Sequence, residues 1–198
     1  MNKAAYPKIK AERKCGTEKI DGIQGATISE FWQWAYSNLM DNAERGIFAE
    51  WLVAKALGAA DDTRTEWDKY DIQTRSGICV EVKSSGYIQS WEQKKLSEIV
   101  FNVPQTIGWD SENNTYGQER KRQADVYVFC VHKHKEQETA DPLNLNQWDF
   151  YVLDTKTLDK KINKQKTLTL KKLIALGAIS ATYEHLNETV EKLGTKEY

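Results

Sequence analysis

The segment ADVYVFCVH, residues 124–132, limits the possible folds more than any other part of the chain. It is almost wholly apolar and rich in valine and aromatic residues, which favour strands. A strand that is apolar on both sides must be covered on both faces of its sheet. The segment therefore predicts a central strand. His132 and His134 alternate at its end and, with no third potential ligand nearby, are expected at the surface.

Helical patterns on either side of this strand supply layers that could cover it. The strongest is DNAERGIFAEWLVAKALG, residues 41–58. Asp41 or Asn42 can cap this helix, and Gly58 can end it as the C′ residue. Four other segments carry helix signals: 27–40, 91–100, 169–177 and 186–194.

Two segments upstream of the central strand have the two-residue period of strands and predict a hairpin. TEWDKYDIQT (65–74) and ICVEVKSS (78–85) are separated by the tight-turn sequence RSG. QWDFYVLDT (147–155) predicts another strand, and GWDSENNTYGQ (108–118) predicts a loop. Together these elements predict a mixed α/β domain whose central sheet of four or more strands is flanked by helices.

Length and composition fit one domain of ordinary type. The chain has 198 residues, of which 1–27 are polar and basic and predict an N-terminal arm, while 28–198 predict a single domain. The net charge of −1 means that any basic surface must be local. No stretch approaches 18 apolar residues, so no membrane span is expected. Three cysteines far apart in sequence fit a reducing, cytoplasmic compartment.

The strand at 78–85 carries the residues that point to chemistry. Glu81 and Lys83 are two residues apart, so their side chains leave the same face of the sheet. A short hairpin would bring Asp71 close to Glu81, and two carboxylates with the backbone carbonyl of Val82 suit Mg²⁺. Lys83 could orient a water molecule and stabilise charge on a phosphate. This set predicts metal-dependent hydrolysis of a phosphodiester.

Glu50 is a further candidate, because it lies within the apolar face of the helix predicted at 41–58. A glutamate on such a face is costly unless it is paired or bound to a metal. Pairing with Arg45 or Lys55 is the structural alternative, but both are five residues away and on a different face of an ideal helix. We therefore expect Glu50 at the site.

In chain order these residues resemble the PD-(D/E)xK nuclease superfamily, which has the restriction-endonuclease-like fold. The features that carry the resemblance are Gly46-x-x-x-Glu50 on a helix, then Asp71, and then Glu81-Val82-Lys83. Tyr70 precedes Asp71, where the superfamily often has proline. More closely similar is a group of uncharacterised bacterial proteins, through the segments 31–58, 80–91 and 124–129.

The resemblance implies a mixed four-stranded sheet with helices on both faces and metal-dependent cleavage of DNA. It implies that Asp71 and Glu81 are metal ligands, that Lys83 is the catalytic lysine, and that Glu50 is the helix carboxylate found in many members. Mg²⁺ would be the cofactor, with Mn²⁺ able to substitute. Gln89 follows the strand where some members have an active-site glutamine. Restriction and defence are among the roles that this resemblance suggests.

Residues outside the acidic set could contact nucleic acid. Ser84 ends the metal-binding strand, and its hydroxyl has either ordinary turn chemistry or a phosphate contact. Arg120, Lys121 and Arg122 precede the central strand and could bind phosphates. A lysine-rich stretch has the same two explanations, solvated surface or phosphate patch; its members are Lys156, Lys160, Lys161, Lys164, Lys166, Lys171 and Lys172.

The leading hypothesis is a metal-dependent endodeoxyribonuclease, and two alternatives stay open. One is a non-catalytic nucleic-acid-binding module on the same fold, which need not bind Mg²⁺ or Mn²⁺. The other keeps the chemistry but acts on RNA or on structured DNA, because the same groups can attack any phosphodiester. Cutting both strands of a duplex would favour a homodimer, since one such site handles one strand at a time.

Overall fold

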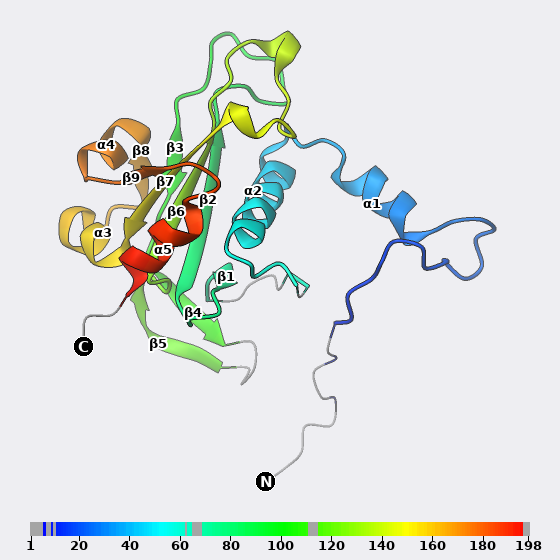
Figure 1. Ribbon diagram of the computed structural model, residues 1–198, viewed down its shortest axis with the longest axis horizontal. Helices are drawn as coiled ribbons and strands as arrows, with labels where there is room; N and C mark the ends of the chain where they lie inside the picture. Colours follow the sequence, from blue (N-terminus) through cyan, green and yellow to red (C-terminus); the bar gives the residue numbers. More distant parts are fainter. Residues whose placement is uncertain are drawn as a thin grey trace.

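The computed structural model describes residues 6, 9, 11–61, 63–64, 69–110 and 115–195 (Figure 1). The helices are α1 (Ile28–Tyr36), α2 (Asn42–Ala56), α3 (Thr155–Ile162), α4 (Leu170–Ala175) and α5 (Leu186–Gly194). The strands are β1 (Ile72–Gln73), β2 (Cys79–Gly86), β3 (Val100–Asn102), β4 (Thr106–Asp110), β5 (Thr115–Lys121), β6 (Val126–His132), β7 (Trp148–Asp154), β8 (Thr167–Thr169) and β9 (Ile179–Ala181). Short 3-10 turns occur at Gln137–Thr139 and Leu145–Gln147.

The centre of the molecule is a five-stranded mixed sheet with the order β1-β2-β6-β7-β9. Strands β2 and β6 pair in parallel, and the other neighbours pair antiparallel. Figure 1 shows α2 and α5 on one side of this sheet and α3 and α4 toward the other. Two small antiparallel pairs, β3 with β8 and β4 with β5, add to it. The predicted mixed α/β fold with a helix-flanked sheet is confirmed.

Strand β6 is buried along its whole length, as its sequence predicts. Val126 and Val128 face a core that includes residues of α2 and α5. Tyr127 and Phe129 face a second core that includes residues of α3, α4, β3 and β8. Burial of an aliphatic or aromatic side chain contributes about 1.5–3 kcal/mol, so β6 anchors both layers.

Helix α2 has the ends that its sequence predicts. The Asp41 carboxylate accepts a hydrogen bond from the Ala43 N–H at 3.1 Å, which caps the first turn. Gly58 follows the helix with φ of 63°, the left-handed conformation of a C′ glycine. Ala49 and Val53 are fully buried, so this helix packs firmly on the sheet.

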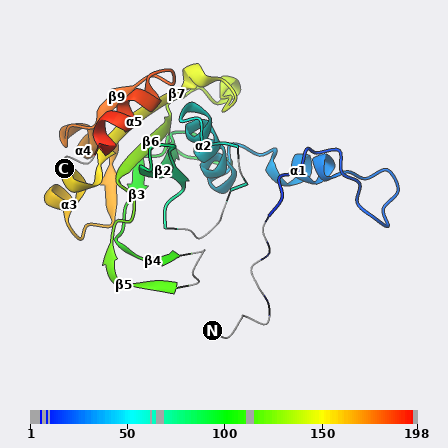
Figure 2. The same ribbon diagram turned by 60° about the horizontal axis from the view of Figure 1, so that its bottom comes forward.

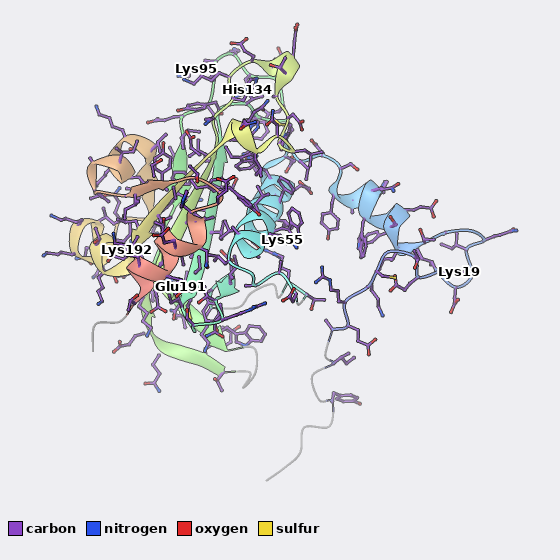
Figure 3. All side chains as sticks on the ribbon, viewed as in Figure 1. Lys19, Lys55, Lys95, His134, Glu191 and Lys192 are labelled. Carbon is purple, nitrogen blue, oxygen red and sulfur yellow. The ribbon has the colours of Figure 1, made fainter. Side chains whose placement is uncertain are left out.

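Helix α1 stands apart from the sheet together with the arm that precedes it. Thr27 and Glu30 form a capping box at its start, and none of its residues is buried. Figures 1 and 2 show α1 and the arm extending away from the body of the molecule. In Figure 3, Lys19 lies at the far end of this extension, distant from Lys55 of α2.

Several predicted elements differ from those observed. The helix expected at 91–100 is absent, and the chain there has bends and an extended stretch that leads into β3. The loop expected at 108–118 is largely the hairpin of β4 and β5, apart from 111–114, which lie outside the described residues. The strand expected at 65–74 is reduced to β1, and 65–68 are likewise outside the described part.

His132 is buried, which corrects its expected surface position. Its side chain is inaccessible to solvent, and its ring packs edge-on against Trp148 with centroids 5.2 Å apart. Burial lowers the pKa of this imidazole, so it is neutral at physiological pH. The long apolar strand β6 therefore continues its buried character to its last residue.

Arg122 is also buried, and its guanidinium ties together segments far apart in sequence. It donates hydrogen bonds to the carbonyl oxygens of Val103 (3.0 Å), Asn163 (2.9 Å) and Gln165 (3.1 Å). It also pairs with Asp159 at 2.5 Å. This structural role replaces the nucleic-acid contact expected for Arg122.

None of the helices in the described part of the chain has the length and apolar character needed to span a membrane.

We predict that Arg122→Met lowers the free energy of unfolding by about 2–4 kcal/mol, because it leaves buried carbonyl groups without their donor. Urea unfolding followed by circular dichroism measures this change. Arg120→Met is the matched control, since Arg120 is exposed on β5 and its replacement should cost little. Equal stability of the two variants would contradict the role given to Arg122.

Candidate functional site

The candidate site begins with two charged side chains on β2. Glu81 and Lys83 are the neighbours of Tyr127 and Phe129 in the parallel pairing with β6, so all four side chains leave the same face. The Lys83 Nζ lies 2.5 Å from the Glu81 Oε1, and both side chains are about three-quarters buried (27% and 21% exposed). This ion pair is therefore fixed in a partly desolvated place.

Asp71 reaches the same place from the edge of the sheet. Its N–H donates to the Val80 carbonyl at 3.1 Å, which extends the β1–β2 pairing. Its carboxylate accepts a hydrogen bond from the Val82 N–H at 2.7 Å. Because the N–H and C=O of one strand residue point to the same side, the Val82 carbonyl also faces this edge. The hairpin therefore brings Asp71 to Glu81, as predicted.

The electrostatics of Asp71 are those of a crowded acid. Burial, followed by the charges of the nearby Glu81 and Glu50 carboxylates, raises its pKa from the usual 3.8 to about 7. The Val82 N–H and the Lys83 ammonium act in the opposite direction. Burial and neighbouring negative charge thus disfavour the charged form of Asp71, and a cation bound beside its carboxylate would stabilise that form.

Glu50 belongs to α2, which packs on the opposite face of the sheet, and its influence on Asp71 places it near the same edge. Its carboxylate forms an ion pair with Arg64, with the Arg64 Nη2 3.1 Å from the Glu50 Oε1. Neither Arg45 nor Lys55, the two partners weighed from the sequence, is its partner. Glu50 is therefore adjacent to the site but held by an arginine.

A divalent cation could be held by Asp71, Glu81 and the Val82 carbonyl. These are hard oxygen donors, and the two carboxylates are close enough for the charge of Glu81 to add to the effect of burial on the pKa of Asp71. Among the residues that the structure describes, no group of three or more His, Cys, Asp or Glu side chains is gathered as a metal site. The donor set thus has two carboxylates, and Glu50 does not complete it here.

A cleft of about 630 Å³ lies over these residues. Its lining includes Asp71, Glu81, Lys83 and Tyr127 from the sheet. Burial, followed by the charge of Glu81, raises the pKa of the Tyr127 hydroxyl, which therefore stays neutral and able to donate a hydrogen bond. Tyr127 was not singled out from the sequence. Its position opposite Glu81 depends on the β2–β6 register, which one sequence does not give.

The second group of residues that line the cleft comes from the β4–β5 hairpin, and sequence reasoning missed it too. Ile107, Trp109 and Tyr116 contribute to the lining, with Gln123 just beyond the hairpin. The only available signal was a pair of aromatic residues on either side of an Asn-rich sequence, in a segment whose composition is typical of a loop.

The residues expected to contact nucleic acid divide into two groups. Gln89 is buried, donates to the Gly86 carbonyl at 2.8 Å and accepts from the buried Arg45. Ser84 lies on the sheet face opposite Glu81, and its hydroxyl is inaccessible to solvent. With Arg122, these residues have structural positions. Arg120 and Lys121 are exposed on β5, beside the cleft.

Comparison with known protein families adds to this geometry. The model of the bacteriophage T4 endonuclease IV family matches residues 16–172. The chain belongs to the bacteriophage T4 endonuclease IV family. Membership of an endonuclease family indicates a nuclease, and the matched range contains every residue placed in the cleft above. A search of curated proteins finds no match.

We predict a pH dependence of stability that is specific to Asp71, measured without divalent cations. The folded state holds a proton on Asp71 up to pH of about 7, whereas the unfolded state releases it near 3.8, so rising pH favours unfolding across this window. Relative to Asp71→Asn, the wild type should lose up to about 4 kcal/mol between pH 4 and 7, since each pKa unit corresponds to about 1.4 kcal/mol.

Urea unfolding of both proteins at several pH values in EDTA provides the measurement. Asn keeps an oxygen acceptor for the Val82 N–H, so the comparison isolates the charge. Parallel stability curves for the two proteins would show that Asp71 titrates normally.

Proposed function

We propose that this protein is a cytoplasmic, metal-dependent endodeoxyribonuclease of the PD-(D/E)xK superfamily, with the restriction-endonuclease-like fold. The observation that supports this most is the placement of the Asp71 carboxylate beside the Glu81–Lys83 pair by the Val82 N–H. The three groups occur in the order and on the elements that the superfamily pattern requires. The endonuclease family match supports the same class of chemistry.

Asp71 and Glu81, with the Val82 carbonyl, would bind Mg²⁺, for which Mn²⁺ could substitute. When bound, such an ion supplies Lewis-acid chemistry: it neutralises phosphate charge and lowers the pKa of water. The two carboxylates hold their oxygens at the sheet edge, on the rigid strand β2 and beside it. This rigidity favours a fixed position for a phosphodiester relative to the attacking water.

Lys83 would act as a cation that positions the attacking water and the phosphate. Its ammonium lies in the cleft and is held by the Glu81 carboxylate at 2.5 Å. From there it can donate hydrogen bonds to the attacking water and to a non-bridging phosphate oxygen, where negative charge increases in the transition state. The neutral Tyr127 hydroxyl offers a further donor in the same cleft.

Glu50 and Arg64 would form a second layer at the edge. Arg64 neutralises Glu50, which limits the negative charge around Asp71. Arg120 is the cross-strand partner of Ile107, which lines the cleft, so its side chain leaves the hairpin on the same face and could bind a DNA phosphate. A homodimer would place two such sites on the two strands of a duplex. Restriction or another defence role fits this chemistry.

We predict that the wild type nicks supercoiled plasmid with Mg²⁺ or Mn²⁺ and not with EDTA, and that Lys83→Ala nicks at least about 100-fold more slowly. The change removes the charge that stabilises the transition state and leaves the fold intact. Agarose gels of plasmid over time, with circular dichroism of both proteins, provide the measurement. Lys55→Ala, an exposed lysine on α2, is the control and should retain full activity. An active Lys83→Ala would rule out the mechanism.

We also predict that Mg²⁺ stabilises the folded protein through Asp71 and Glu81. At 100 times the dissociation constant a ligand adds about 2.7 kcal/mol, which raises the melting temperature by about 5–10 °C for a chain of this size. Differential scanning calorimetry should show this shift for the wild type and its loss in Glu81→Gln. Glu188→Gln, at an exposed position on α5, is the control. An equal shift in Glu81→Gln would place the ion elsewhere.

The same two experiments separate the alternatives. A non-catalytic binding module would show neither nicking nor the Glu81-dependent shift. A nuclease for RNA or structured DNA would show the shift without plasmid nicking, and the substrate would then be sought among labelled RNA and branched DNA.

A further inference from the structure

The cleft has two unlike walls. One carries the charged residues of the proposed catalytic site, Glu81 and Lys83 among them. The other is the β4–β5 hairpin, which contributes the apolar side chains of Ile107, Trp109 and Tyr116. Ile107 is 45% exposed and Tyr116 is 75% exposed, so large apolar groups face solvent at the mouth of a polar site. Exposed aromatic groups beside a charged centre indicate a ligand with both characters.

The pairing of the two strands directs two rings to the same side. Trp109 and Tyr116 are direct cross-strand partners, so their side chains leave the same face of the hairpin. Both line the cleft, which identifies that face as the one turned toward Glu81. Figures 1 and 2 show the hairpin leaving the body of the molecule as a separate ribbon below the sheet. An open ribbon with rings on its inner face has the shape of a platform.

The base of the ribbon is fixed relative to the central strand. The Gln123 amide nitrogen donates to the carbonyls of Thr106 (2.8 Å) and Lys121 (3.2 Å), one on each strand of the hairpin. Gly108 allows this close approach, since a Cβ there would lie 2.7 Å from the Gln123 Oε1. Gln123 is three residues before β6, which carries Tyr127 in the cleft. The platform is therefore held at a set position beside the catalytic groups.

The chemistry of the cleft selects one kind of ligand group. A phosphodiester bound at Asp71, Glu81 and Lys83 is joined to sugars and bases, and a base is flat, with polar edges and weakly polar faces. Stacking of a base on an aromatic side chain contributes about 1–3 kcal/mol and tolerates any base, because each has a π-face. A cleft of about 630 Å³ is within the range of small-ligand sites.

We propose that Trp109 and Tyr116 form a nucleobase-binding subsite that stacks on a base adjacent to the scissile phosphate. By holding that base, the two rings position the phosphate over the catalytic groups. This inference rests on the proposed nuclease function and adds to it two positioning residues. An alternative use of the same rings, as a contact surface for another protein, would leave cleavage independent of them.

The test couples the rings to a base in the substrate. A labelled deoxyoligonucleotide, in single-stranded and duplex form, is cut by the wild type to map the scissile bond, and abasic sites are then placed one at a time around it. An abasic site at the stacked position should lower kcat/KM of the wild type by about 5- to 150-fold. The Trp109→Ala/Tyr116→Ala double variant should show the same loss of kcat/KM on the intact substrate. For this variant, an abasic site at the stacked position should cause no further decrease in kcat/KM.

Conservative and distant variants separate stacking from folding. Trp109→Phe/Tyr116→Phe keeps two rings and should restore most of the activity. Trp91→Ala removes an aromatic residue that is 52% exposed and does not line the cleft, and should behave as the wild type. If the abasic penalty persists in the double alanine variant, or is absent from the wild type, the rings do not bind a base and the proposal is overturned.

A binding readout keeps this inference distinct from the proposed catalysis. Oligonucleotides with 2-aminopurine at successive positions are mixed with Lys83→Ala, and stacking at one position should quench the fluorescence. A variant that combines Trp109→Ala and Tyr116→Ala with Lys83→Ala should not quench the fluorescence. Quenching that depends on the rings, without cleavage by the wild type, would retain the subsite and overturn the nuclease. Cleavage without such quenching would retain the nuclease and overturn the subsite.

Discussion

The parallel pairing of β2 with β6 is the constraint on which the rest of the structure depends. Strand β6 is buried on both faces, so its neighbour is held along seven consecutive residue pairs, from Val80–Val126 to Gly86–His132. This pairing directs alternate residues of β2 to opposite faces of the sheet. Val80 and Val82 enter the core beneath α2 and α5, and Glu81 and Lys83 leave the opposite face. A slip of one residue would bury the charges and expose the valines, so the register is strongly enforced.

The sheet edge converts this register into a site. Strand β1 is two residues long and begins directly after Asp71, whose carboxylate accepts a hydrogen bond from the Val82 N–H. A longer β1 would have used that N–H in a backbone pair and left the carboxylate elsewhere. Burial, followed by the charges of Glu81 and Glu50, raises the pKa of Asp71, and the Val82 N–H and the Lys83 ammonium offset part of this shift. Geometry and charge at the edge thus have one cause.

The sequence predicts the features that depend on the spacing of apolar and polar residues within one segment. It misses those that depend on side chains from distant segments coming together. Alternation in β2, the hairpin to Asp71 and the apolar run of β6 are visible as patterns, and each is confirmed. The partner of Glu50 is Arg64, in a segment between α2 and β1 that has no helical spacing to it. The interior position of Arg122 depends on carbonyls from two distant segments, which no spacing reveals.

The hairpin of β4 and β5 was missed for a related reason. Its segment is rich in Asn and Gly, a composition typical of loops. Its pairing depends on side chains that meet only when the chain folds back.

The short β1 has a consequence for association. It pairs with only Cys79 and Val80, so within the described residues no strand is hydrogen-bonded to the outer edge of β2 beyond them. Bare sheet edges invite strands of other chains, and charged groups at an edge discourage such pairing. Asp71, Glu81 and Lys83 stand at or beside this edge. The side chains that suit the strand to phosphodiester chemistry therefore also protect the sheet from growing by addition of another chain.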